Sequence, residues 1–450
     1  MKRLKKVIPF ALFACIAFST LPLSACGEND GENVLRIASW DEYICEGGED
    51  SYFGEGAPLY EEFETWYKET YGKEVTVKYI PLQDNETMYN KIKMGDSYDL
   101  LCPSEYMIMK LAEEGYIQKL PSTFYDTDIE HNYYAKYVSP YIKDVFENGT
   151  MNDGSKWAEY TAGYMWGSTG FVYNPQTVDK EDVKSWNIFT NKKYERKITA
   201  KDNVRDSYFA GLGIYHEQAM LALKNKLESG EITLSEYKIA LSTMMNDTSE
   251  NTMKNVQNIL KSLRQNVYGL ETDEGKLDVV TGRFDISYQW SGDAVYTLDV
   301  GESEEINDEP IYLEYCIPDA ASNLFFDGWV LMKDSKNVDA ATAFINFLSI
   351  PQNVIRNMYY IGYTSCVGGE EVYEYVQETY GASEDEEDTT LYDLSYFFGE
   401  DHQLLTTKEQ TTRQLFAQYP DVSTIDRLVV MKYFDKETNE RANRMWNTIK

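Results

Sequence analysis

The chain has 450 residues, of which 43% are hydrophobic and 26% are charged, a composition typical of globular proteins and not of disordered ones. Its 75 acidic and 42 basic residues give a formal net charge of −33, which disfavours nucleic acid as a partner and favours cationic ligands, although acidity also simply provides solubility. At about 150 residues per domain, the length predicts two or three domains.

The N-terminus has the features of a secretory signal. An apolar run at 7–18 follows four basic residues, and Leu23-Ser24-Ala25 precedes a cysteine. This ending resembles a bacterial lipobox, so we expect a signal peptide at 1–25, lipidation of Cys26 and a tether at 26–33. The alternative is an ordinary secreted protein. In both cases we expect an extracytoplasmic protein. If the lipobox is real, the lipid on Cys26 is the protein's sole anchor to the bacterial cell membrane.

Strands and helices alternate in the next part of the chain. Apolar runs bounded by capping residues, glycines and proline predict strands at 34–38, 75–80 and 98–102, and helices at 60–71, 84–94 and 103–115. This order predicts an α/β fold with a parallel sheet.

Aromatic and polar residues follow two of these strands. Trp40-Asp41-Glu42-Tyr43 comes after the first strand, and Ser104-Glu105-Tyr106 comes after the third. In parallel sheets, ligands bind at the carboxyl ends of the strands. We therefore expect both clusters on one rim, at a binding site.

The later part of the chain continues the α/β pattern. Residues 163–174 predict a strand that crosses between domains, and 285–290 and 325–331 predict two more strands. Helices are expected at 217–229, 235–245, 252–265 and 338–348. The acidic run at 381–388 predicts a solvated surface insertion, because it lacks the spacing of a calcium loop.

Motifs for catalysis and for metal binding are missing from the sequence. The histidines, His131, His216 and His402, lie far apart, and there is no nucleophile elbow or phosphate-binding loop. We expect no enzyme, no metal and no cofactor, although a glycoside hydrolase with two carboxylates stays open as an alternative. Four cysteines remain after the predicted signal and lipid site, and they could pair or stay free: Cys45, Cys102, Cys316 and Cys366.

Aromatic residues are abundant, with 37 tyrosines and 8 tryptophans. Most must lie in the core, but aromatic faces together with carboxylates suit organic cations.

Several sequence motifs, which follow one another in the same order as in a known family, indicate a resemblance to that family. The chain resembles the substrate-binding lipoproteins of spermidine/putrescine ABC importers at 40–43, 85–89, 98–100, 103–106, 163–167, 202–206, Trp290, 325–327 and 361–363.

The resemblance implies a two-lobed periplasmic-binding-protein fold of type II, with two crossovers and a ligand cleft between the lobes. Lobe one would comprise 34–166 and 328–382, and lobe two 167–327 and 383–450. It implies capture of polyamines and their delivery to a permease with its ATPase, by a protein that is itself monomeric. Another organic cation or a sugar is the alternative ligand.

The resemblance also assigns roles in the cleft. One set of aromatic side chains would wall the methylene chain of the amine: Trp40, Tyr43, Trp290, Phe325 and Tyr363. Asp41, Ser104 and Tyr106 would bind polar ends in lobe one. Asp206 and Asp327 would bind the ammonium groups, with Asn203 beside them.

The chain departs from the family pattern at a few of these positions. Asn203 replaces a common acid, Asp41 replaces a hydroxyl residue, and Phe325 replaces a common tryptophan. Two insertions, at 45–58 and around 370–420, lengthen the chain. These departures leave the preferred polyamine open.

Overall fold

The computed structural model describes residues 33–49, 51–151, 153–272, 275–303 and 310–450. The predicted signal peptide, Cys26 and the predicted tether up to residue 32 lie outside these ranges. Within them, none of the helices combines the length and the apolar character needed to cross a membrane.

The first part of the chain alternates as predicted. Strands β1 (Val34–Trp40), β2 (Thr76–Leu82) and β3 (Leu100–Leu101) run parallel, with β1 in the middle. Helices α1 (Leu59–Tyr71), α2 (Asn85–Met94) and α3 (Glu105–Glu113) connect them. Gly72 and Gly95 end the first two helices in the left-handed conformation, at φ 66° and 98°, which glycine adopts without strain.

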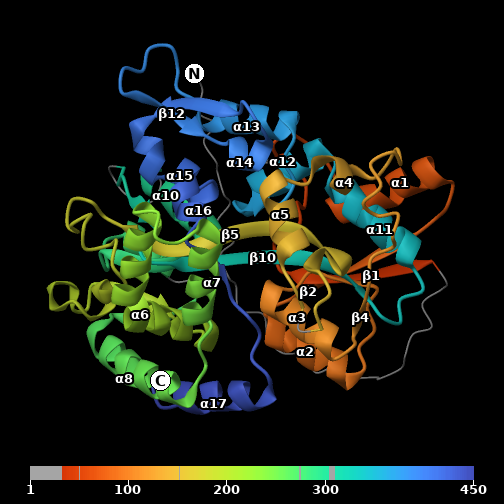
Figure 1. Ribbon diagram of the computed structural model, residues 1–450. Coiled ribbons are helices and arrows are strands. Elements are labelled where there is room, and N and C mark those ends of the chain that lie inside the picture. The colour runs from red at the N-terminus through yellow and green to blue at the C-terminus, as the bar shows by residue number, and fades with distance from the viewer. Residues whose placement is uncertain (1–32, 50, 152, 273–274, 304–309) are drawn as a thin grey trace, which may run out of the picture.

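Two long strands run side by side through the middle of the molecule (Figure 1). Strand β5 (Thr161–Tyr173) pairs antiparallel with β10 (Ser322–Met332), and the register shifts between Asp327 and Gly328. One end of β10 pairs with β3, whereas the far end of β5 pairs with β8 (Ile286–Trp290). Both strands therefore belong to both parts of the sheet, which is the arrangement expected of two crossovers.

The second part of the sheet extends from β8. Strand β6 (Ile198–Lys201) runs parallel to β8 and to β7 (Gly269–Glu271), which gives the order β2-β1-β3-β10-β5-β8-β6-β7. The whole sheet is mixed, and not parallel as its first elements suggest, because β5 and β10 run antiparallel to each other and β10 runs antiparallel to β3.

Helix α6 (Val204–Glu228) begins 13 residues earlier than the sequence predicts, at 204 instead of 217. Its first turns are buried on every side from Arg205 to Gly213, so they lack the alternation of polar and apolar faces that marks a surface helix. Asn203 caps the helix by accepting from the backbone N–H groups of Arg205 and Asp206. Helices α7 (Leu234–Met245) and α8 (Glu250–Asn266) pack beside it.

Short helices and strands complete the fold. They are β4 (Ile117–Gln118), α4 (Tyr133–Tyr137), α5 (Pro140–Asn148), α9 (Gly275–Val280), α10 (Ser291–Glu302), β9 (Glu314–Cys316), α11 (Val338–Leu348), α12 (Pro351–Ile361), β11 (Thr364–Ser365), α13 (Glu370–Tyr380), β12 (Thr389–Asp393), α14 (Ser395–Phe398), β13 (Gln403–Thr407), α15 (Gln414–Gln418), α16 (Val422–Ile425), β14 (Leu428–Val430) and α17 (Lys436–Trp446). The acidic stretch before β12 is exposed at 384–388, as predicted for a solvated insertion.

Two clusters of buried hydrophobic side chains form the core. The larger includes residues of the first sheet part, together with side chains from Tyr392 to Tyr419, and the smaller surrounds α6 and α8. The boundary at 383 between the predicted lobes stays a prediction. Of the cysteines in the described ranges, all four are free thiols, three of them buried.

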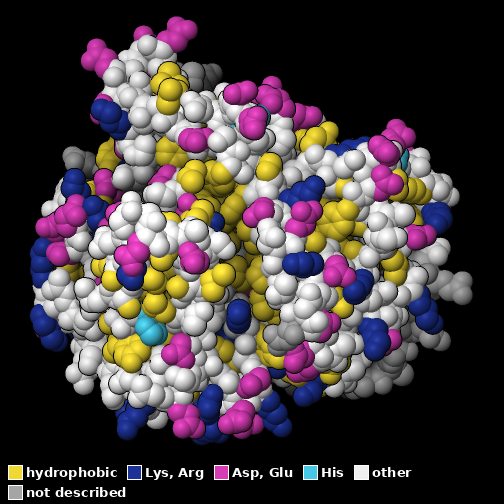
Figure 2. Space-filling model, in the orientation of Figure 1, with side chains coloured by type: hydrophobic (Ala, Val, Ile, Leu, Met, Phe, Trp, Pro, Cys, Tyr) yellow, Lys and Arg dark blue, Asp and Glu magenta, His cyan; other side chains and the backbone are white. Residues whose placement is uncertain are grey.

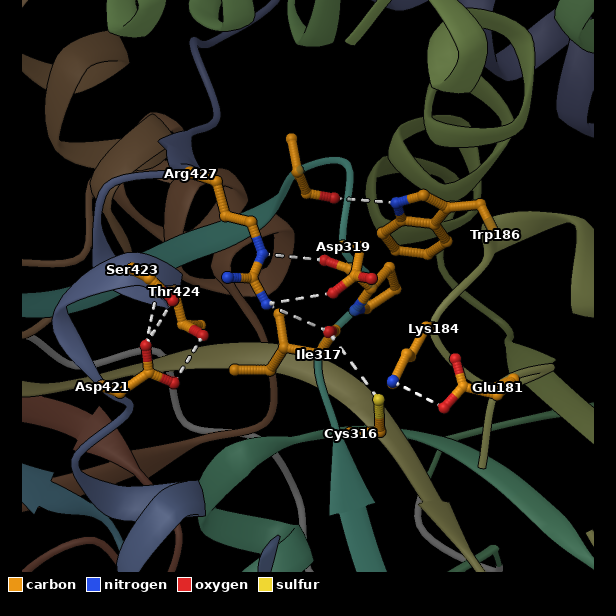
Figure 3. A network of polar contacts seen from close by, with 12 residues as sticks. Glu181, Lys184, Trp186, Cys316, Ile317, Asp319, Asp421, Ser423, Thr424 and Arg427 are labelled. Atoms are coloured by element: carbon orange, nitrogen blue, oxygen red, sulfur yellow. Dashed lines mark hydrogen bonds and ion pairs between the residues drawn. The ribbon is translucent and has the colours of Figure 1, made fainter. Parts of the chain in front are cut away.

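Figure 3 shows a polar network in which the C-terminal segment around Arg427 contacts the residues before β10. Arg427 donates from Nε to the carbonyl of Pro318 at 3.0 Å and from Nη2 to that of Ile317 at 3.3 Å. Trp186 donates to the carbonyl of Ala321 at 2.7 Å from the opposite side. Strand β14 follows this network and pairs parallel with residues 322–324.

Candidate functional site

Asp327 is the centre of the candidate site. It lies at the register shift of β10 and is only 6% exposed. Its Oδ2 accepts from Trp40 Nε1 at 3.2 Å and from Tyr43 Oη at 2.6 Å, and Ser104 donates a further side-chain hydrogen bond. Burial raises the pKa of Asp327, and these three donors oppose the rise. Three uncharged donors, Trp40, Tyr43 and Ser104, thus fix the orientation of the carboxylate, and none of them neutralises its charge.

The local fold explains why these donors converge. Trp40 is the last residue of β1, and Ser104 precedes the first residue of α3. Ser104 forms an isolated bridge with Asp327, and Asn85 holds it by donating to Oγ at 3.0 Å and accepting from its backbone N–H at 3.1 Å. The structure therefore brings Trp40, Tyr43 and Ser104, from the two clusters on the rim, onto one carboxylate of a crossing strand.

Aromatic rings continue from this carboxylate. The ring centroid of Tyr363 lies 6.0 Å from that of Tyr43 and 6.1 Å from that of Phe325, both in edge-on geometry. Tyr363 Oη donates to Asp293 Oδ1 at 3.3 Å. These rings place apolar surface beside Asp327, as a ligand with a hydrocarbon chain requires.

A second buried carboxylate lies in the first turn of α6. Asp206 is 5% exposed, and burial raises its pKa to about 6. The ammonium of Lys201, a hydrogen bond from Trp290 and the charge of Arg205 oppose this rise. Asn203 is occupied as the helix cap, and its Oδ1 accepts from the Arg205 N–H at 2.7 Å.

Tyr106 and Arg205 join the two sides of the site. The guanidinium carbon of Arg205, on α6, lies 4.7 Å from the ring centroid of Tyr106, on α3, and 3.7 Å from that of Phe434. Arg205 also donates to the carbonyl of Lys432, and Tyr106 Oη donates to Glu86 at 3.1 Å. The segment before α17 thus contacts Arg205, through the ring of Phe434 and the carbonyl of Lys432.

Asp41 is separate from this arrangement. It is exposed, and it is among the acids that add to the rise of the Tyr360 pKa to about 12, which burial mainly causes. The structure places the ten other candidate ligand residues in the groups around Asp327 and Asp206 described above.

Several charged residues near these two groups were given no role from the sequence. Glu105 is 2% exposed, and burial raises its pKa to about 8, with a further contribution from Asp327. Lys201, Glu271 and Asp293 are also buried. Glu105 and Arg205 lie inside the motifs at 103–106 and 202–206, and Lys201 directly precedes the second of these, so these motifs are the signal that could have identified them. Glu271 stands at a strand end without a motif.

Two cavities lie away from this site. One of about 300 Å³ is lined by residues 181–191, and one of about 490 Å³ by residues between Lys119 and Glu159.

On the face drawn in Figure 2, acidic side chains are spread over both halves of the molecule, and hydrophobic side chains line the hollow between the halves. Two oriented carboxylates with aromatic faces suit a cation with apolar segments.

Comparisons with known proteins agree with this chemistry. The sequence profile of the family described as bacterial extracellular solute-binding protein matches residues 59–369. The chain is 24% identical to the spermidine/putrescine-binding periplasmic protein of Escherichia coli, over 74% of this chain and 78% of that protein. It is also 24% identical to a putrescine-binding periplasmic protein of Pseudomonas aeruginosa, over 78% of this chain and 82% of that one.

A solved structure resembles the whole arrangement. The spermidine/putrescine ABC transporter substrate-binding protein of Streptococcus pneumoniae superimposes with a TM-score of 0.59 and 24% identity, over 93% of this chain and 98% of that chain. This likeness confirms the predicted α/β fold, a periplasmic-binding-protein fold of type II.

Proposed function

The chain belongs to the family of bacterial extracellular solute-binding proteins, and we propose that it captures a polyamine and delivers it to the permease of an ABC importer. The observation that carries the proposal is the buried carboxylate of Asp327, oriented by Trp40, Tyr43 and Ser104 beside the rings of Tyr43, Tyr363 and Phe325. An ammonium placed there would receive a charge-assisted hydrogen bond and contact aromatic faces. The names of the relatives support the same class of ligand.

The second carboxylate supports binding between two lobes. Asp206 lies on α6 in the predicted lobe two, whereas Asp327, on the crossing strand β10, is bonded by Trp40, Tyr43 and Ser104 of the predicted lobe one. A polyamine with one ammonium on each carboxylate contacts both sides at once, so it favours the closed arrangement over the open one. Delivery then depends on the permease recognising the closed form.

The proposal extends to the setting of the protein. The predicted signal and Cys26 would place it outside the cytoplasm, held by a lipid and acting as a monomer. Its strong negative charge would attract polyamines at a distance, an effect that salt weakens. Binding without turnover distinguishes this function from glycoside hydrolysis.

Tryptophan fluorescence tests the proposal, because Trp40 and Trp290 contact the two carboxylates. We expect putrescine or spermidine to change the emission in a saturable way, and we expect Trp40→Phe to lose part of the change. Trp186→Phe is the matched control, since its indole bonds to Ala321 away from the site. Emission that responds to neither amine would contradict the proposal.

A further inference from the structure

Lys201 is a buried cation inside the candidate site. It ends strand β6 and is 1% exposed. Its Nζ lies 4.1 Å from the ring centroid of Trp290 and donates to the carbonyl of Thr272 at 2.8 Å. Trp290 ends the parallel neighbouring strand β8, so both side chains stand at the carboxyl end of this part of the sheet. The face of Trp290 therefore already carries an ammonium of the chain itself.

Two carboxyl groups interact electrostatically with this ammonium, and one of them, Glu271, is the strand partner of Lys201. Burial raises the pKa of both Asp206 and Glu271, and the charge of Lys201 opposes the rise in each. Glu271 is held in place, because it accepts from Thr199 Oγ1 at 3.3 Å and from the backbone N–H of Gly275 at 3.1 Å. An aromatic face with two acids is the environment that an ammonium of a ligand would seek.

The charges around the site leave room for two ammonium groups. When these acids are ionised, the charges of Asp206, Glu271 and Lys201 sum to one negative charge on this side, and Asp327 contributes one negative charge on the other side. Among the other charged groups nearby, Lys276 lies 3.5 Å from Asp293, and the charges of Arg205 and Glu86 attract each other. Burial raises the pKa of Glu105 to about 8, so this acid is mainly neutral at pH 7. A third ligand ammonium would meet the positive charge of Lys201 in a buried place, where like charges repel strongly.

We propose that Lys201 is a specificity-determining residue, whose ammonium takes the place of a third ligand ammonium and makes the protein select diamines over triamines. This inference rests on the proposed function and goes further, because it names the class of polyamine.

The test compares putrescine and spermidine by titration calorimetry on the purified protein and on Lys201→Met, which keeps the apolar stem and removes the charge. We expect the unchanged protein to bind putrescine at least tenfold more tightly than spermidine. In Lys201→Met, the ratio of the two dissociation constants should move at least tenfold towards spermidine. Lys197→Met is the matched control, since it removes a lysine of the same segment that is half exposed and bonded to Asp285.

The outcomes separate the two proposals. A shift of the ratio below threefold in a folded Lys201→Met protein, or tighter binding of spermidine by the unchanged protein, overturns the role of Lys201. If Lys201→Met does not fold, Lys201→Gln replaces it in the test. If neither variant folds, the ratio of the putrescine and spermidine dissociation constants of the unchanged protein decides whether the role of Lys201 stands. Binding of neither amine by the unchanged protein refutes the proposed function instead.

Discussion

Replacing Asp327 by asparagine tests whether its carboxylate binds the ligand or only stabilises the fold. The amide keeps the size of the side chain and one acceptor oxygen, which can replace the Oδ2 that accepts from both Trp40 and Tyr43, and it removes the negative charge. A hydrogen bond to a charged group contributes about 1.5–3 kcal/mol, and each 1.4 kcal/mol corresponds to a factor of about ten. We therefore expect Asp327→Asn to weaken polyamine binding roughly 10- to 150-fold.

The same substitution should not destabilise the ligand-free protein at pH 7. Burial raises the pKa of Asp327 above its value in the unfolded chain, so ionisation favours the unfolded state and stability falls as the pH rises through this range. An asparagine does not ionise and avoids this loss. We expect the free energy of unfolding of the variant, measured by urea denaturation at pH 7, to equal or exceed that of the unchanged protein.

Asp99→Asn provides the matched control. Asp99 is 7% exposed and accepts from the backbone N–H of Arg36 at 2.9 Å, from Ser335 Oγ at 2.7 Å and from Asn337 Nδ2 at 3.2 Å. Its substitution should lower the free energy of unfolding by about 1–3 kcal/mol and leave the amine affinity within twofold. An affinity of Asp327→Asn within twofold of the unchanged protein would refute the reasoning.

Two further predictions follow from buried acids. Because burial raises the pKa of Asp206 to about 6 and a bound ammonium favours its ionised form, amine affinity should fall about tenfold between pH 7.5 and pH 5. Titration calorimetry at both pH values checks this, and an equal fall in Asp206→Asn would contradict it. Glu105→Gln should raise the free energy of unfolding at pH 7 by up to about 3 kcal/mol, because burial raises the pKa of Glu105 to about 8. The gain should disappear below pH 4, where the wild-type residue is protonated in both states, and a gain that persists there would argue against a buried neutral Glu105.

The sequence predicts best where structure is local. The helix that ends at Gly72 and the one capped by Asp84 follow from side-chain spacing and capping chemistry, and both are confirmed. The order of strands and helices predicts that the clusters after β1 and β3 share a rim, and hydrogen bonds to Asp327 join Trp40 and Tyr43 of the first cluster with Ser104 of the second. The roles of the site residues came only from the family resemblance, and they stay predictions.

Features that depend on distant contacts could not be predicted from the sequence. The first turns of α6 are buried throughout, so no periodic pattern marks the start of the helix. Lys201 and Glu271 come together because β6 and β7 pair in parallel across about 70 residues of chain. Lys201 precedes the motif at 202–206 without belonging to it, and Glu271 lies in no motif, so the cation on Trp290 is seen only in the folded arrangement.

Titration calorimetry with putrescine, spermidine and maltose, at low and at high salt, tests the central claim most directly. The account predicts saturable binding of a polyamine at one site per chain, weaker at high salt, and no binding of maltose. Binding of maltose without binding of either amine would contradict it.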